Sequence, residues 1–296
     1  MRFGVREICN VVFKATVANQ RVGEKTFAKG EPVIYFDSLK TSTMEQAVTT
    51  VYAQGGRGNT RLVAWDGEKT LTFTMEDALI SEMGLAILAS ARLWTADADN
   101  KNTLVVHVSE VVNELAVSKV PSKAEGVKFY GLPLNDNGEI AGAAVEVTIA
   151  ETPTEGTGKY AVTANGLEGK AYLIDYYTDK ATGATQIDIE PQNFGGNFYI
   201  EADTLFRDTN GADHAAQFII PNGKIQSNFT LSMASSGDPS TFTFTVDAFP
   251  GYVNGDLTKK VMSAIQILGD DEEIGVNDPA GDKEDSAKYV IVADGE

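Results

Sequence analysis

Cysteine and histidine are nearly absent from this sequence of 296 residues, which contains one cysteine, Cys9, and two histidines, His107 and His214. A single cysteine cannot build an internal disulfide framework. The patterns His-Glu-x-x-His, Cys-x-x-Cys and Gly-x-Ser-x-Gly, which mark zinc, redox and hydrolase sites, are also missing. His107 lies within an apolar run, and one further histidine does not supply partners at metal-ligand spacing. We therefore expect no metal ion and no cofactor.

Three other features of the sequence could indicate catalysis. His214 follows Asp213 and could act as a general base, but the turn-like residues before it favour a surface turn. The glycine-rich stretch 54–59 lacks the Gly-Lys-Ser/Thr ending of a phosphate-binding loop, so we interpret it as a flexible loop. A glycosidase pair of carboxylates cannot be assigned from sequence and stays open as an alternative, although no pattern favours it. The sequence predicts that the protein is not an enzyme.

Basic residues are scarce, with 24 Lys and Arg against 42 Asp and Glu, giving a formal net charge of -18. Binding to phosphates requires a basic surface, and the sequence contains no cluster of Lys and Arg. We expect no specific binding of nucleic acid. The acidity suits a surface that must not adhere to nucleic acid.

Long apolar runs are also missing, since no stretch of about 18 apolar residues occurs. The first seven residues, 1–7, show no apolar segment of the kind that secretory signals contain. We therefore expect no membrane association, and we expect the chain to be made and folded in a cytoplasm.

The clearest positive feature is strict alternation of apolar and polar residues between Gly223 and Phe249, which predicts a long β-hairpin. Ile225, Phe229 and Leu231 would lie on one face of its first strand. The return strand would place Phe242, Phe244 and Val246 on one face and threonines on the other. Residues 235–240 supply the turn.

A shorter hairpin is predicted at 61–74, because Asp66-Gly67 separates two alternating runs. One helix is predicted at 75–91, with Thr74 as N-cap and apolar residues at helical spacing. A second, short helix could begin at Ser42, with Glu45 three residues later.

The rest of the chain consists of short β-like segments with turns, so the predicted fold class is mainly β. We expect a β-sandwich or small barrel with one flanking α-helix. The expected divisions are an N-terminal core part at 1–124, a candidate small β insertion domain at 125–185 and a C-terminal core part at 186–268. The last part contains the long hairpin 223–249, and a strand at 260–268 is expected to pair with the return arm of that hairpin.

The segment 269–296 forms an acidic C-terminal segment with ten acids and two lysines. We favour a solvated segment over a calcium site at 270–273. Its apolar patch at 289–292 could add an edge strand.

Several stretches resemble the tail tube (major tail) proteins of bacteriophages. The resemblance rests on 219–231 (Ile-Ile-Pro-Asn-Gly-Lys-Ile-Gln-Ser-Asn-Phe-Thr-Leu) followed by 237–244 (Gly-Asp-Pro-Ser-Thr-Phe-Thr-Phe). It extends to 51–56 and 65–73, and to a tyrosine-rich strand pair within 158–177. Together these stretches span much of residues 45–250.

This resemblance implies a structural virion protein without cofactors. Tube subunits of that kind form rings, expected to be hexameric, whose hairpins join into an inner β-barrel. The rings stack into a tube through which DNA passes without specific binding. The implied location is the virion tail, assembled in the host cytoplasm, and the implied partners are other copies of the chain and sheath, baseplate or tail-terminator proteins.

Polar residues of the two predicted hairpins are then the candidates for the channel lining or the contact between subunits. They are Lys224, Gln226, Asn228, Thr230, Ser232, Thr241, Thr243, Thr245, Asp247, Glu68, Lys69, Thr70 and Thr72. The assignment depends on register, because a shift by one residue exchanges the two faces. The competing hypothesis is a β-sandwich binding module, such as an adhesin, a baseplate protein or a decoration protein.

Overall fold

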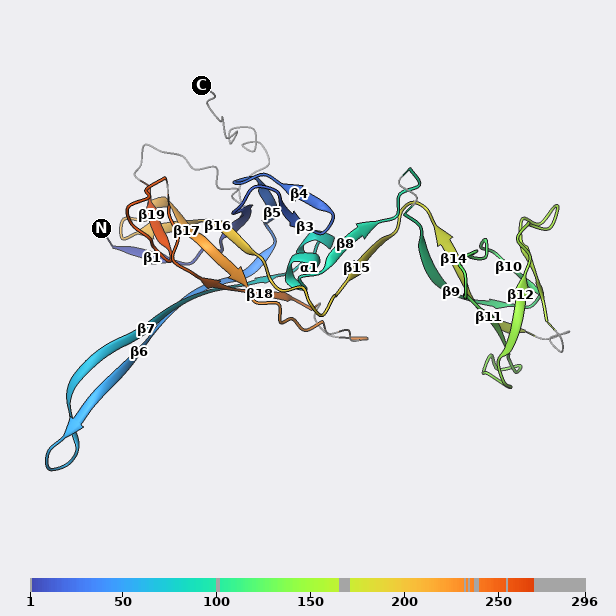
Figure 1. The fold of residues 1–296 in the computed structure, drawn as a ribbon, viewed down its shortest axis with the longest axis horizontal. Coiled ribbons are helices and arrows are strands. Elements are labelled where there is room, and N and C mark those ends of the chain that lie inside the picture. The colour runs from blue at the N-terminus through green and yellow to red at the C-terminus, as the bar shows by residue number, and fades with distance from the viewer. Residues whose placement is uncertain are drawn as a thin grey trace, which may run out of the picture. The chain divides into compact units, whose positions relative to one another are not determined.

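The computed structural model describes residues 2–99, 102–164, 171–231, 233, 235–236, 240–253 and 255–268 (Figure 1). The chain divides into two compact units. Unit 1 comprises Met1–Leu93 and Ile187–Glu296, and unit 2 comprises Trp94–Gln186. The acidic segment 269–296, with its expected edge strand and calcium alternative, lies outside the described residues.

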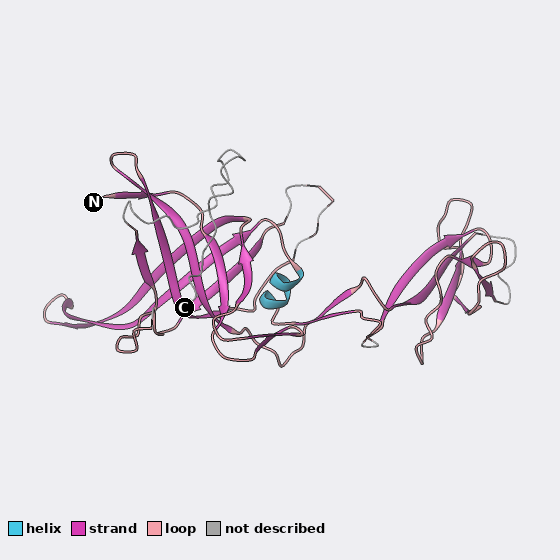
Figure 2. Ribbon diagram, turned by 90° about the horizontal axis from the view of Figure 1, so that it is seen from above, coloured by secondary structure: helices cyan, strands magenta, loops and turns pink. Residues whose placement is uncertain are grey.

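Unit 1 contains a nine-stranded, antiparallel, nearly closed sheet, whose curvature is visible in Figure 2. Seven strands follow the order β5-β2-β16-β17-β18-β7-β6, while β1 adds to β16 and β19 to β17. The strands are β1 (Phe3–Val5), β2 (Asn10–Ala15), β5 (Pro32–Phe36), β6 (Leu39–Gly55), β7 (Thr60–Asp77), β16 (Asn197–Asp208), β17 (Asp213–Ile225), β18 (Phe242–Ala248) and β19 (Ala264–Ile267). A separate pair, β3 (Gln20–Val22) and β4 (Lys25–Phe27), lies between β2 and β5 in sequence.

The core of unit 1 is formed by alternate residues of these strands. Val11 and Phe13 on β2, Phe73 and Met75 on β7, and Phe244 on β18 are almost completely buried. Aromatic rings in this core pack edge to face, as in Phe244 and Phe36 of β5, whose ring centroids lie 4.9 Å apart. The prediction of a mainly β protein with a barrel-like sheet is confirmed, and α1 (Glu82–Leu88) is the one α-helix among the described residues.

Helix α1 is much shorter than the predicted helix 75–91. The prediction that this helix begins at residue 75 is wrong. Residues 75–77 complete β7, where Met75 and Asp77 alternate with Glu76 in burial. The helix begins after Ser81, whose Oγ accepts a hydrogen bond from the Gly84 amide at 2.9 Å. Strand pairing with β18 therefore overrides helical propensity in this stretch. The predicted helix at 42–45 is also wrong, because these residues belong to β6.

The predicted hairpin at 61–74 is wrong as well, since Asp66-Gly67 lies inside β7. Residues 60–77 form one strand that pairs with β6 along its length, and the connecting turn is the glycine-rich stretch 56–59. Gly56 and Gly58 have positive φ angles of 79° and 95°, which a tight turn permits in glycine. The long hairpin of this protein is thus β6–β7.

The predicted hairpin 223–249 is only partly formed. β17 ends at Ile225, and it pairs with β18 only over Gly223–Ile225 and Val246–Ala248. Residues 226–231 form no strand, so the alternation of Asn228, Phe229 and Thr230 does not mark a ladder. β17 instead extends backwards to Asp213 and pairs with β16 and β19. The expected partner of the last strand was therefore wrong, because β19 pairs with β17 and not with β18.

Unit 2 has its own six-stranded sheet, in the order β10-β13-β12-β11-β14-β9. Its strands are β9 (Leu104–Val112), β10 (Ala116–Val117), β11 (Phe129–Pro133), β12 (Val145–Ile149), β13 (Tyr160–Thr163) and β14 (Tyr172–Lys180). Ile174 and Tyr176 are at the centre of a separate hydrophobic core. The segment 125–185 lies within this unit. The chain passes between the units along β8 (Arg92–Thr95) and β15 (Thr185–Asp188), which pair with each other.

Candidate assembly interface

The most exposed element of unit 1 is the distal part of the β6–β7 hairpin, residues 46–70, which we call the arm (Figure 1). β18 pairs with β7 only from Thr72 to Asp77, so the strand edges of the arm have no further strand partner in the part of the chain that the structure describes. Every residue of β7 from Thr60 to Thr70 is exposed. The arm is held by its own ladder alone, with two strands and open edges of the kind that proteins normally cover.

The two faces of the arm differ in chemistry. Val51 pairs with Trp65, and Ala53 pairs with Val63, so these four side chains lie on one face, the apolar face of the arm. Trp65 is 56% exposed and Val51 is 65% exposed. Large apolar residues in such a position mark a surface that a partner covers.

The opposite face of the arm, which we call the polar face, carries Thr50 and Asp66 beside the pair Tyr52 and Ala64, and it makes internal contacts. The guanidinium of Arg61 lies 4.1 Å from the centre of the Tyr52 ring, a cation–π contact. Thr50 Oγ1 donates to Asp66 Oδ1 at 3.2 Å. These residues satisfy each other within the hairpin, whereas the apolar face has no such partner within the arm.

The structure brings together only part of the predicted lining residues. Lys224, Asp247 and Thr72 lie side by side across β17, β18 and β7, on the sheet face opposite the core. Gln226 joins them through hydrogen bonds of 3.0 Å from its Nε2 to both carboxylate oxygens of Asp247. Glu68 and Thr70 continue this face along β7, whereas Lys69 points to the other side because side chains alternate.

A second group of predicted residues lines a polar cleft of about 570 Å³ beside the start of β18. Its lining includes Asn228, Thr230, Thr241, Thr243 and Thr245. Ser232 lies outside the described residues. The distal arm was not predicted from the sequence, although one signal was available: two runs rich in β-branched residues flank the glycine-rich stretch 54–59.

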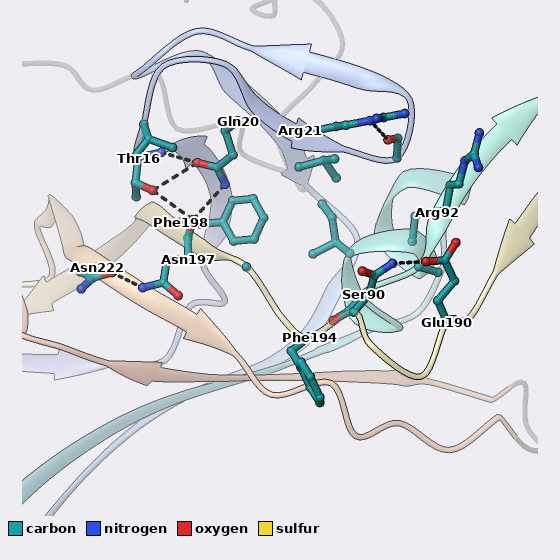
Figure 3. Close-up of a pocket in the computed structure, with 18 residues that line it drawn as sticks. Thr16, Gln20, Arg21, Ser90, Arg92, Glu190, Phe194, Asn197, Phe198 and Asn222 are labelled. Atoms are coloured by element: carbon teal, nitrogen blue, oxygen red, sulfur yellow. Dashed lines mark hydrogen bonds between the residues drawn. The ribbon is translucent and has the colours of Figure 1, made fainter.

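A larger groove of about 950 Å³ lies beside α1 and is lined by residues of unit 1; we call it the α1 groove (Figure 3). Gln20 Nε2 donates to the carbonyl of Asn197 at 2.9 Å, and Asn193 Nδ2 donates to Glu190 Oε2 at the same distance. Ile87 and Phe198 are buried in the core beneath it. Phe194, in contrast, is 77% exposed.

The two histidines differ in outcome: the surface-turn prediction for His214 is wrong, whereas His107 lies in a strand, as its apolar neighbours predict. His214 is not in a surface turn: it is buried at 4% exposure near the start of β17, with its ring edge-on to Phe3. His107 is exposed on β9, where Nε2 contacts the carboxylate of Asp175. Cys9 is buried in the core. Among the described residues, no group of three or more His, Cys, Asp or Glu side chains is placed to hold a metal ion.

No helix in the described part of the chain is both long and apolar enough to cross a membrane. No curated protein matches the sequence closely enough to be compared with it. The sequence does match the YomU/Tube protein family over residues 17–262, a span that includes the arm, the polar cleft and all of unit 2. Because the match covers well over half of the chain, the protein belongs to this family, which identifies it as a tail tube structural protein of a bacteriophage.

Proposed function

We propose that the protein polymerises as stacked hexameric rings into the tail tube that conducts DNA. The observation that carries this proposal is the combination of a nearly closed sheet with an arm that has no strand partner among the described residues beyond its own hairpin. Ring closure would pair strand edges that are otherwise open to aggregation. Assembly would take place in the host cytoplasm, with sheath, baseplate or tail-terminator proteins as further partners.

The lining of the channel would come from the polar face of the sheet around Lys224, Asp247, Thr72, Thr243 and Thr245. This face lies opposite the hydrophobic core, so it is available to water in each subunit. The threonines of this face carry no cation for phosphate, and its lysine, Lys224, lies opposite the acidic Asp247 in the ladder. The net charge of -18 per chain would oppose retention of DNA. The role proposed is mechanical and requires no catalytic group.

Negative-stain microscopy of the purified protein over a range of concentrations tests assembly. We expect rings or tubes with a central channel. A chain that remains monomeric at high concentration and binds glycans or cell surfaces would instead support the binding-module hypothesis and contradict the tube.

Adding positive charge tests the lining. The variant Thr243→Lys/Thr245→Lys should form tubes that retain DNA in a salt-dependent manner. The matched control is Thr148→Lys/Thr163→Lys, two exposed threonines paired across β12 and β13 of unit 2. If both variants retain DNA equally, the proposed face is not the lining.

A further inference from the structure

The apolar face of the arm is too exposed to be explained by the fold of a single chain. Val51 and Trp65 are directly opposed, and Ala53 and Val63 continue the same face. More than half of the surface of both Val51 and Trp65 is accessible, and Val63 is 49% exposed. Contiguous apolar surface of this kind is typical of a contact with another molecule.

The α1 groove has the complementary character. Its floor contains Ile87 and Phe198, which belong to the core, and its rim contains Val17 and Phe194, which are exposed. A cavity of about 950 Å³ is at the upper end of the range in which clefts enclose compact apolar ligands, so it has room for several large side chains. The polar groups of Gln20 and Asn193 are already engaged with neighbouring residues, so the apolar part of the lining is available for contact beside the charged groups of Arg21 and Arg92.

The arm of one chain does not reach its own groove. Within unit 1 the arm projects away from α1 and the 190–197 loop (Figure 1). A contact between two different surfaces of identical chains is heterologous, and such contacts produce rings or open filaments. A contact between the arm of one chain and the α1 groove of the next is heterologous, so it is compatible with a ring or with a stack of rings.

Charge also favours a second copy as the partner. Between Gln46 and Trp65 the charged residues are Arg57 and Arg61, with no acid, in a chain that has 42 acids against 24 basic residues. The end of the arm is therefore a basic element on an acidic protein. Attraction between the arm and the acidic surface of another copy would guide the encounter. The groove itself is lined by Arg21, Arg92 and Glu190, so charge would act on the encounter with the acidic chain as a whole, and apolar contact would hold the arm in the groove.

We propose that the apolar face of the arm docks in the α1 groove of a second copy of the chain. The proposal rests on the proposed function, because it names the contact through which copies join. Trp65 and Val63 would enter the groove beside Phe194, while the Tyr52–Arg61 face stays in water.

Thiol labelling tests this docking on the full chain. Cys9 is buried and contributes little background. Three single-cysteine additions are compared as monomer and as assembly: Val63→Cys on the apolar face, Phe194→Cys at the groove and Tyr52→Cys on the polar face. We expect assembly to slow maleimide labelling at positions 63 and 194 by tenfold or more, and at position 52 by less than threefold.

The results separate this inference from the proposed function. Assemblies in which position 63 or position 194 labels at the monomer rate overturn the docking and leave the tube intact. A chain that never assembles overturns both. Equal protection at 52 and 63 also overturns the docking, because it shows that the arm is covered without a preferred face.

A truncation of the arm surface provides an independent test. Trp65→Ser should raise the concentration needed for assembly by tenfold or more, and it should remove protection at Phe194→Cys in the assemblies that still form. The matched control is Thr50→Ser on the polar face, which should assemble as the wild type does. Circular dichroism of both monomers checks that the fold is retained. Unchanged assembly of Trp65→Ser contradicts the proposal.

Discussion

At the scale of single residues, Cys9 shows how the core changes the chemistry of a side chain. It is buried beside Ser42, and burial raises the pKa of its thiol from an ordinary value of 9.0 to about 11. The thiolate is the reactive form of cysteine, so the native protein should resist alkylation at neutral pH. This residue is a structural part of the core.

The raised pKa predicts a loss of stability in alkali. Above pH 9 the unfolded chain releases the thiol proton while the native chain keeps it, so the free energy of unfolding falls as pH rises to about 11. The stability advantage of the wild type over Cys9→Ala should shrink by about 2 kcal/mol between pH 8 and pH 10.5. Urea titrations of both proteins at the two pH values measure it. A constant difference would show that the thiol does not titrate differently in the two states.

Phe244 tests the importance of the aromatic core of unit 1. It is fully buried and packs against Phe36. Phe244→Ala should lower the free energy of unfolding by about 3–5 kcal/mol, because it removes buried surface and leaves a cavity. Phe249→Ala, close in sequence but 44% exposed, is the control and should cost less than about 1 kcal/mol. Similar losses in the two variants would contradict the assigned core.

At the scale of elements, a β-bulge in the arm explains why Asp66-Gly67 does not form a turn. The pairing of β6 with β7 shifts between Val48 and Thr50, so two residues of β7, Gly67 and Glu68, lie opposite Thr49 alone. Thr49 Oγ1 accepts a hydrogen bond from the Glu68 amide at 2.8 Å. A Cβ at position 67 would lie 2.8 Å from the same Oγ1 atom. Glycine is therefore needed for the close approach in a bulge.

This bulge predicts the behaviour of Gly67→Ala. The added methyl group should displace the Thr49 side chain and break its hydrogen bond with Glu68, so the Glu68 amide should exchange with solvent about tenfold faster. Hydrogen exchange measures this. Thr49→Ala removes the same acceptor and should behave alike, while Thr49→Ser should retain the slow exchange. Slow exchange in both alanine variants would exclude the bulge contact.

At the scale of the whole molecule, each unit has its own hydrophobic core. The buried cluster of unit 1 includes Phe13 and Phe244, and that of unit 2 includes Ile174 and Tyr176. The two connecting strands, β8 and β15, lie side by side, and just beyond them the Ala96 amide donates a hydrogen bond to the Ala184 carbonyl at 2.8 Å. Ala96 and Ala184 are therefore already placed as the two residues that flank the turn of a β-hairpin.

This arrangement predicts that unit 2 can be removed. Replacing residues 97–183 by Asn-Gly would close β8 and β15 with a two-residue turn. We expect the shortened chain to keep a β-type circular dichroism spectrum and one cooperative unfolding transition, because its core residues are unchanged. Loss of cooperative unfolding would show that unit 1 depends on unit 2.

Sequence patterns predicted the buried sides of β7 and β18 well, because each strand has one face in the core and one in water. Leu71 and Phe73 on β7, and Phe244 and Val246 on β18, alternate in the sequence as they do in burial. Patterns failed where residues on both faces are exposed, as in the arm. They also failed at residues 226–231, where alternation occurs without a neighbouring strand to pair with.

The sequence by itself determined the mainly β fold, the acidity and the resemblance to tail tube proteins, since these depend on composition and local alternation. Only the tertiary structure decided which strands pair, including the pairing of β17 with β16 and β19. It also decided that the glycine-rich stretch is the turn of the long hairpin and that Gly67 lies in a bulge. Strand pairing depends on residues far apart in the chain, and local propensity does not encode it. The apolar face of the arm follows from that pairing, because Val51 and Trp65 become neighbours only once the register is set.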